Sequence, residues 1–267
     1  MILSYDQLLP HLPVFLAVVS RIAGLLFFAP ILGSPMIPAR VKALLAIALG
    51  AATYATIDLR REVPLELTLS SLGPAMFSEA LIGLAIGVIA SLPLVCMEMG
   101  GLLMGQQMGL GLAGFYNPAV DSDADIVGQF LFYMALGLFL AAGGVEMMVR
   151  AVTVSFARVP IGAFGAGDAP LELFAGLLVS GTELAMRVAA PVFAILFVET
   201  AASALITKTA PQLNVLSLGF PVRIMLALAT MYASLGAVHW AASYSVGDTM
   251  EALGVWVQGL GAAKGGG

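Results

Sequence analysis

Residues 97–125 read MEMGGLLMGQQMGLGLAGFYNPAVDSDAD, and this stretch says most about the fold of the chain. Its glycines recur at every fourth position, at Gly101, Gly105 and Gly109. On a helix of about 3.6 residues per turn, this spacing leaves one flank almost without side chains. A neighbouring backbone can approach such a flank closely, and an upstream pair of glycines repeats the spacing. The helix-packing glycines that we predict are Gly83, Gly87, Gly101 and Gly105.

Methionines interleave with these glycines. Met97, Met104 and Met108 fall on one face of the same helix, beside the glycine flank. Simple helix–helix packing explains this face, and the small-residue spacing favours that interpretation. The alternative is a deformable surface that lines a passage, because thioether side chains repack around variable neighbours.

The helical pattern then gives way to a loop, residues 109–125, which contains two misleading motifs. Residues 109–114 spell GxGxxG, but the dinucleotide fingerprint requires a preceding strand, and here a helix precedes it. Residues 121–125 (DSDAD) resemble the start of a calcium-binding loop, yet Ile126 and Phe132 stand where Gly and Glu are required. We expect this acidic run to be either a solvated loop or the start of the next helix, where acidic residues are favoured by the helix dipole.

The composition indicates a membrane protein. The chain has 267 residues, of which 60% are hydrophobic, and its mean hydropathy is +1.02. Only 10% of the residues are charged, whereas soluble domains have about 25%. We predict an all-α fold of hydrophobic hairpins, with residues 1–260 as a single domain and residues 261–267 as a flexible glycine-rich tail.

The sequence offers little for catalysis, metals or nucleic acid. Cys96 is the only cysteine, and His11 and His239 are far apart in the chain. These residues provide neither a zinc-site spacing nor a catalytic triad. No Walker A motif is present. The net charge of −5 contains no basic run, which argues against nucleic-acid binding. We therefore expect no catalytic residue, no cofactor and no metal.

Seven helical segments are predicted from the apolar runs, several of them long enough to cross a bilayer. The last two are long enough to break or to form hairpins, and Pro191 and Pro221 mark expected kinks or boundaries. The start of the chain lacks the features of a cleaved signal and is expected to be a retained helix. The Lys and Arg residues in the connections do not alternate clearly between the two sides of the membrane, so they do not define a topology. The predicted segments are 14–32, 41–57, 72–97, 100–115, 126–149, 171–207 and 213–246.

Ionisable residues inside these apolar segments need partners, because an isolated charge is costly in hydrocarbon. Glu183 and Arg187 are four residues apart on one helix, a spacing that suits an ion pair. For the whole set we favour structural pairing, within this chain or across subunits, over a path for protons or ions. The seven residues are Arg21, Glu79, Glu98, Glu146, Glu183, Arg187 and Glu199.

Several separated segments of the chain resemble the FliR family of the flagellar type III export apparatus, and they do so in the same order along the sequence. Residues 21–42 (RIAGLLFFAPILGSPMIPARVK) are similar to the N-terminal signature of that family. Several separate matches in the same order identify a family far more specifically than a single match does. The others are 105–110 (GQQMGL), 115–118 (FYNP), 127–131 (VGQFL), 159–162 (VPIG) and 210–223 (APQLNVLSLGFPVR).

The resemblance implies a non-enzymatic subunit of an export gate in the bacterial inner membrane, at the flagellar basal body. The implied partners are FliP-like and FliQ-like subunits, an FlhB-like subunit, and the unfolded flagellar proteins that the gate exports. Helical hairpins stacked in a spiral are the implied architecture. The family also implies that residues 109–125 form a loop that plugs the closed pore. Its named members here are Gly109, Gly111, Gly114, Phe115, Tyr116, Asn117 and Pro118.

Two other functions stay open on the sequence. Injectisome export-gate subunits share the family's fold, although the amino-acid sequence of residues 210–223 favours the flagellar system. A small secondary permease is the second alternative, but its paired repeats with broken helices are not seen in the two halves of the chain.

Overall fold

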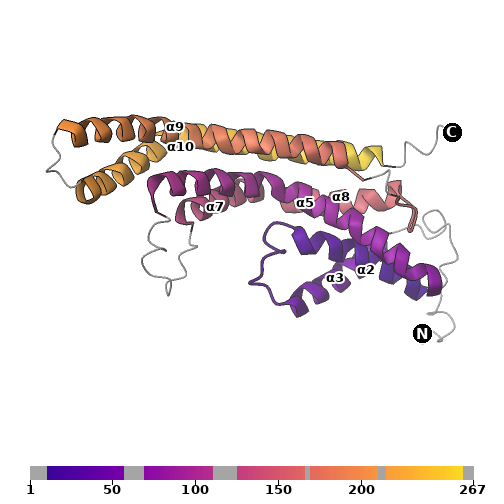
Figure 1. Ribbon diagram of the computed structural model, residues 1–267. Helices are drawn as coiled ribbons and strands as arrows, with labels where there is room; N and C mark the ends of the chain where they lie inside the picture. Colours follow the sequence, from indigo (N-terminus) through magenta and orange to yellow (C-terminus); the bar gives the residue numbers. More distant parts are fainter. Residues whose placement is uncertain (1–10, 57–68, 111–124, 166–168, 210–214, 261–267) are drawn as a thin grey trace. The chain divides into compact units, whose positions relative to one another are not determined.

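The computed structural model describes residues 11–56, 69–110, 125–165, 169–209 and 215–260, and these ranges are helical with short connections (Figure 1). The predicted all-α, polytopic fold is confirmed. The predicted tail at 261–267 lies outside the described residues. The helices are α2 (His11–Phe28), α3 (Ala39–Tyr54), α5 (Leu69–Met108), α7 (Ile126–Ala141), α8 (Gly144–Arg158), α9 (Leu171–Thr209) and α10 (Val215–Gly259).

Four helices in the described ranges are long and apolar enough to cross a membrane, and a fifth span results if a bent pair counts as one. The four are α2, 72–108 of α5, α9, and 219–259 of α10. The bent pair is α7 with α8, which meet at 63°. α3 has 16 residues and falls short of the roughly 20 that a span needs.

The structure corrects three helix boundaries that the sequence suggested. The last helix was predicted to end at residue 246, but α10 continues to Gly259. Residues 72–97 and 100–115 were predicted as separate helices, but α5 runs without a break through Gly100 and Gly101 and ends at Met108. Two glycines lower helix propensity only weakly, and close packing at both of them compensates. Residues 126–149 were predicted as one helix, but the chain breaks at Gly143, whose φ of +74° ends α7.

Prolines do not end the two C-terminal helices. Pro191 lies inside α9 and Pro221 inside α10, and both helices continue past them for several turns. A proline removes one backbone hydrogen bond, which a long helix in an apolar setting tolerates when neighbouring groups compensate.

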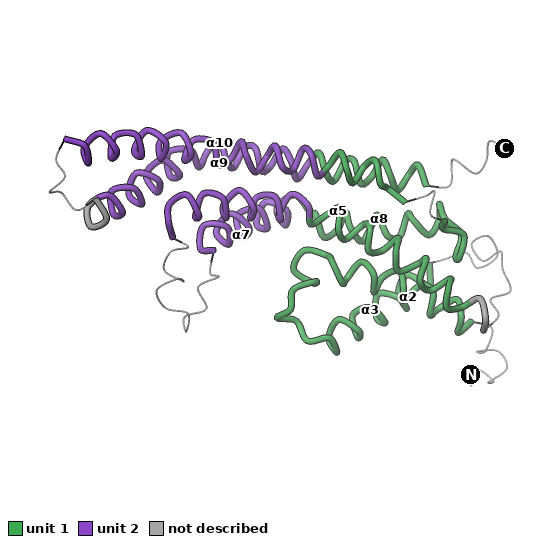
Figure 2. Tube along the Cα trace, viewed as in Figure 1, with its two compact units in different colours: residues 1–91, 143–177, 248–267 green, residues 92–142, 178–247 purple. Residues whose placement is uncertain are grey.

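The chain divides into two compact units, and three helices run from one unit into the other (Figure 2). Unit 1 comprises residues 1–91, 143–177 and 248–267, and unit 2 comprises residues 92–142 and 178–247. The three shared helices are α5, α9 and α10. That residues 1–260 behave as one domain stays a prediction.

Unit 1 contains the α2–α3 pair, the first half of α5, and α8. Its core is made mostly of aliphatic side chains on the facing sides of these helices. The turn between α2 and α3 holds Ile31 at a φ of +71°, and Lys42 Nζ donates a hydrogen bond of 2.9 Å to the Gly33 carbonyl oxygen. The largest buried core side chains of the unit include Ile22, Ile82, Ile86, Ile89, Met148 and Phe156.

Unit 2 contains the second half of α5, the antiparallel helix α7, and all of α9 and α10 except the first turns of α9 and the last turns of α10. Glycine and alanine set the distance between its helices. A Cβ added to Gly100 would lie 3.0 Å from the Ala185 carbonyl oxygen of α9. At Gly181 of α9, a Cβ would meet the buried sulfur of Cys96. Close backbone contact therefore joins α5 to α9 in this unit.

Candidate functional site

The hairpin of α5 and α7 carries the connection that the sequence singled out. At Gly101, an added Cβ would lie 2.5 Å from Gly128 Cα, so two glycine backbones meet directly. At Gly105 the nearest atom to an added Cβ is Asp125 Oδ1, at 3.2 Å. Both predicted glycines therefore face α7 or its first cap, and the tighter approach is at Gly101.

The two ends of the connection are fixed close to this contact. Gly109, with a φ of +83°, ends α5, and the Leu110 N–H donates to the Gly105 carbonyl oxygen at 3.1 Å. At the other end, Asp125 caps α7 by accepting a hydrogen bond of 2.9 Å from the Gly128 N–H. The remaining residues predicted for the plug lie outside the described ranges: Gly111, Gly114, Phe115, Tyr116, Asn117 and Pro118.

The methionine face of α5 is buried. Met97, Met104 and Met108 are all almost completely covered, whereas Met99 on another side of the helix is exposed. This burial favours the packing interpretation of the methionine face over a surface that lines a passage.

The other predicted glycine pair brings α5 against α2. A Cβ at Gly83 would overlap the carbonyl oxygen of Arg21, and one at Gly87 would lie 2.8 Å from the Leu25 carbonyl oxygen. From the opposite side, Gly24 faces the backbone of Ala80. Because the two backbones are this close, side chains beside the contact are enclosed between the helices.

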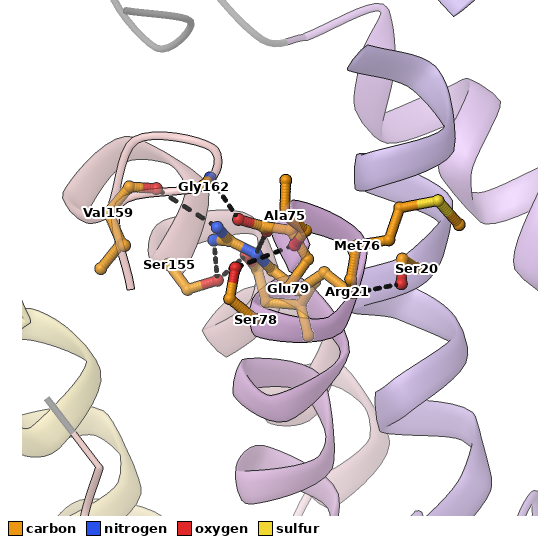
Figure 3. A network of polar contacts seen from close by, with 10 residues as sticks. Ser20, Arg21, Ala75, Met76, Ser78, Glu79, Ser155, Val159 and Gly162 are labelled. Carbon is orange, nitrogen blue, oxygen red and sulfur yellow. Dashed lines mark hydrogen bonds and ion pairs between the residues drawn. The ribbon is translucent and has the colours of Figure 1, made fainter. Parts of the chain in front are cut away.

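A network of buried charges lies beside this helix contact (Figure 3). Arg21 of α2 and Glu79 of α5 are both 0% exposed, and Arg21 Nε lies 2.6 Å from Glu79 Oε2. Arg21 also donates to Ser155 Oγ of α8 at 2.9 Å and to the Val159 carbonyl oxygen at 3.2 Å. Glu79 Oε1 accepts from the Gly162 N–H at 2.9 Å.

This network joins three helices and a turn. Phe156 of α8 adds a cation–π contact, with the Arg21 guanidinium carbon 4.0 Å from its ring centroid. Gly162 has a φ of +78°, a conformation that favours glycine and allows its N–H to reach Glu79. Together these contacts fix the turn after α8 to α2 and α5, and they compensate two charges that would otherwise be very costly to bury.

The other ionisable residues behave in different ways. Arg187 Nη2 lies 2.7 Å from Glu183 Oε1, and the two side chains are 61% and 66% exposed. Glu199 is 8% exposed, and its Oε2 lies 3.9 Å from Arg223 Nε. Glu98 is half-buried in α5, and Glu146 is exposed in the first turn of α8, where a carboxylate is favoured.

Sequence reasoning identified both charges of the buried network but did not pair them. Arg21 and Glu79 are 58 positions apart, so no helical spacing could connect them. It missed Ser155, which is marked only as a polar residue, and it missed Val159 and Gly162, although these two stand in the segment 159–162 quoted for the family resemblance. It also missed Arg223, although this residue stands in a segment quoted for the family resemblance.

The arrangement of these groups suits packing and positioning. Within the described ranges, no group of three His, Cys, Asp or Glu side chains lies close enough together to hold a metal ion.

Comparison with known proteins identifies the family. Residues 12–248 match the family described as "Bacterial export proteins, family 1". "Flagellar biosynthetic protein FliR" of Bacillus subtilis is 28% identical over 225 residues, which cover 82% of this chain and 85% of the relative. The protein of the same name in Escherichia coli is 28% identical over 233 residues, covering 85% and 86%.

An injectisome relative matches over a shorter region. "Yop proteins translocation protein T" of Yersinia pestis is 27% identical over 151 residues, which cover 56% of this chain and 58% of the relative. The flagellar relatives therefore match more of the chain than this one does. The family consists of export proteins and not of enzymes. With its family match over 12–248 and its four or five candidate spans, the chain belongs to the bacterial export proteins of family 1, as a FliR-family flagellar export protein of the inner membrane.

Proposed function

We propose that the chain is a subunit of the flagellar type III export gate. In this proposal it forms, together with FliP-like and FliQ-like subunits, the pore through which unfolded flagellar proteins cross the inner membrane, and an FlhB-like subunit acts beside it. The observation that carries the proposal is the family match over residues 12–248. The apolar surface of the C-terminal helices supports it, because only 17% of the best span window of α9 and 11% of that of α10 are buried within the chain.

The connection 109–125 is the proposed plug of the closed pore. Its two ends are held by Gly109 and by the Asp125 cap, on helices that meet at Gly101 and Gly128. A loop whose ends are anchored on a tightly packed hairpin can close a passage without the hairpin itself moving. The bulky members Phe115 and Tyr116 would fill the passage, and Pro118 would stiffen the loop.

Deleting residues 111–118 tests the plug. The hairpin contact and both caps lie outside the deleted residues, so we expect assembly to survive while the membrane becomes permeable to ions and small molecules. Leakage would be measured in cells that express the gate, and assembly by recovery of the FliP-like and FliQ-like subunits. Deletion of eight residues from the connection 57–68 is the matched control and should leave permeability unchanged. An assembled deletion variant that does not leak would refute the plug.

An injectisome gate is the second candidate, because the Yersinia relative is a translocation protein. The two systems differ in their partners. Co-purification of the tagged chain from its own cells, followed by identification of the bound subunits, separates them. Recovery of the chain as a stable, functional monomer would contradict both.

A further inference from the structure

A second charged group, in the α9–α10 hairpin of unit 2, is paired incompletely. Arg223 Nε lies 3.9 Å from Glu199 Oε2, which is too long for a hydrogen bond. This buried nitrogen has no hydrogen-bond partner in the described part of the chain. Glu199, in contrast, accepts a hydrogen bond of 2.7 Å from the Ser203 hydroxyl of its own helix.

The Arg223 side chain is partly exposed at the surface of the chain. It is 30% exposed although Nε is buried, so the exposed area belongs to other atoms of the side chain. A guanidinium carries five N–H donors and always keeps its charge. The contrast with Arg21 is direct, because Arg21 is 0% exposed and donates from Nε and from both terminal nitrogens.

The surroundings of Arg223 are apolar. Arg223 is the ninth residue of α10, so it lies about 12 Å along the helix from its first residue. A cation at this depth of an apolar hairpin normally pairs or faces a watery cavity. Exposed apolar side chains flank the pair along both helices, with Phe197 and Val198 beside Glu199 in the sequence, and Val222 and Leu226 beside Arg223.

We propose that this face of the α9–α10 hairpin binds a membrane helix of a partner subunit, and that Arg223 receives a carboxylate of that helix. A carboxylate accepts two guanidinium N–H groups at once, and the charge-assisted pair is stronger than a bond to a neutral acceptor. The apolar side chains around it pack against the same helix. The inference rests on the proposed function, and it adds the position and the chemistry of one contact.

The first experiment removes the charge. The tagged chain is co-expressed with the FliP-like and FliQ-like subunits of its own operon, and partner recovery is measured after purification in mild detergent. We expect Arg223→Leu to lower recovery at least about tenfold, since truncating one member of an interfacial charge pair has effects of this size. Arg223→Lys should retain part of the recovery. Lys208→Leu, which removes an exposed cation from the last turn of α9, is the matched control and should behave as wild type.

The second experiment identifies the carboxylate. Each Asp and Glu in the membrane helices of the partners is replaced by its amide, and one replacement should reproduce the loss. Arg223→Glu combined with a basic residue at that partner position should then restore recovery. Thermal stability of the isolated variants in detergent shows that the hairpin still folds, and an Arg223→Leu chain that fails this control is replaced by Arg223→Gln.

The outcomes are separable. If the wild-type chain recovers no partner, the proposed function fails. If wild type recovers partners and Arg223→Leu recovers them equally, the inference is overturned while the proposed function stands. If Arg223→Leu keeps its partners but loses bound phosphatidylglycerol, measured by lipid extraction, the acceptor is a lipid phosphate and the inference is also overturned.

Discussion

Replacing Arg21 by Met tests the buried network most directly. The substitution removes the 2.6 Å ion pair with Glu79 and the hydrogen bonds to Ser155 and Val159. Glu79 then stays buried, with the Gly162 N–H as its remaining donor in the network. Ser155 is affected less, because its hydroxyl also donates to the Val152 carbonyl oxygen at 2.7 Å. The dominant cost is therefore the uncompensated carboxylate.

The size of the effect follows from the burial of both partners. Because both side chains are 0% exposed, screening by water is minimal, and removing one partner of such a pair costs about 3–5 kcal/mol. This is a large part of the roughly 5–15 kcal/mol by which proteins are stable. Replacing both partners, in Arg21→Met with Glu79→Leu, leaves no unpaired charge. The double variant should be close to wild type, and the coupling between the two sites should reach about 3 kcal/mol or more.

The assay needs a reporter in the same unit. Ala90 of α5 is fully buried in unit 1, so a cysteine there, in a Cys96→Ala background, becomes reactive to a thiol dye only when the unit opens. Free energies of unfolding come from dye labelling during titration with a denaturing detergent. Arg158→Met, an exposed cation at the end of α8, is the matched control and should change stability by less than about 0.5 kcal/mol. A loss below about 1 kcal/mol for Arg21→Met, or a double variant whose loss equals the sum of the single losses, would refute the reasoning.

Two smaller perturbations probe the α5–α7 hairpin. Gly101→Ala should destabilise unit 2 by about 1–3 kcal/mol, since its Cβ would lie 2.5 Å from Gly128 Cα and neither backbone can yield cheaply. Gly137→Ala, with open space around the site, should be neutral or stabilising by up to about 1 kcal/mol, and dye labelling of the native Cys96 measures both. Asp125→Ala should cost about 1 kcal/mol and speed amide exchange in the first turn of α7, because the Gly128 N–H loses its acceptor. Asp125→Asn keeps the cap, and equal exchange in the two variants would contradict the capping role.

The sequence predicted the helical class and most of the spans, because the apolar runs are long and their composition is extreme. Helix ends were less accurate where packing decides. Gly100 and Gly101 look like a break, but α9 and α7 approach the backbone there and the helix continues. The Gly143–Gly144 pair is a sequence signal for the break between α7 and α8, because glycine commonly ends a helix in the left-handed conformation.

The sequence predicted which residues of the candidate site matter, but it did not predict which of them contact each other. The glycine spacings identified positions that the structure places at helix contacts. The costs of buried charge identified Arg21 and Glu79, yet their pairing depends on how α2 crosses α5, which no local pattern encodes. The orphaned donor at Arg223 is of the same kind, because a positive charge in an apolar run is visible in sequence while its missing acceptor is visible only in three dimensions.

The buried pair also explains how so apolar a chain selects one arrangement of its helices. With 60% hydrophobic residues, aliphatic faces of α2 and α5 could pack in several registers of similar energy. A slip of one helical turn moves a residue by about 5.4 Å along the axis. Such a slip would carry Arg21 Nε out of reach of Glu79 and would separate Gly83 and Gly24 from the backbones that they accommodate. Both charges would then be buried without partners, at a cost of several kcal/mol that no aliphatic repacking returns. The polar network therefore fixes the register of α2 on α5, and through Ser155, Val159 and Gly162 it fixes the end of α8 as well.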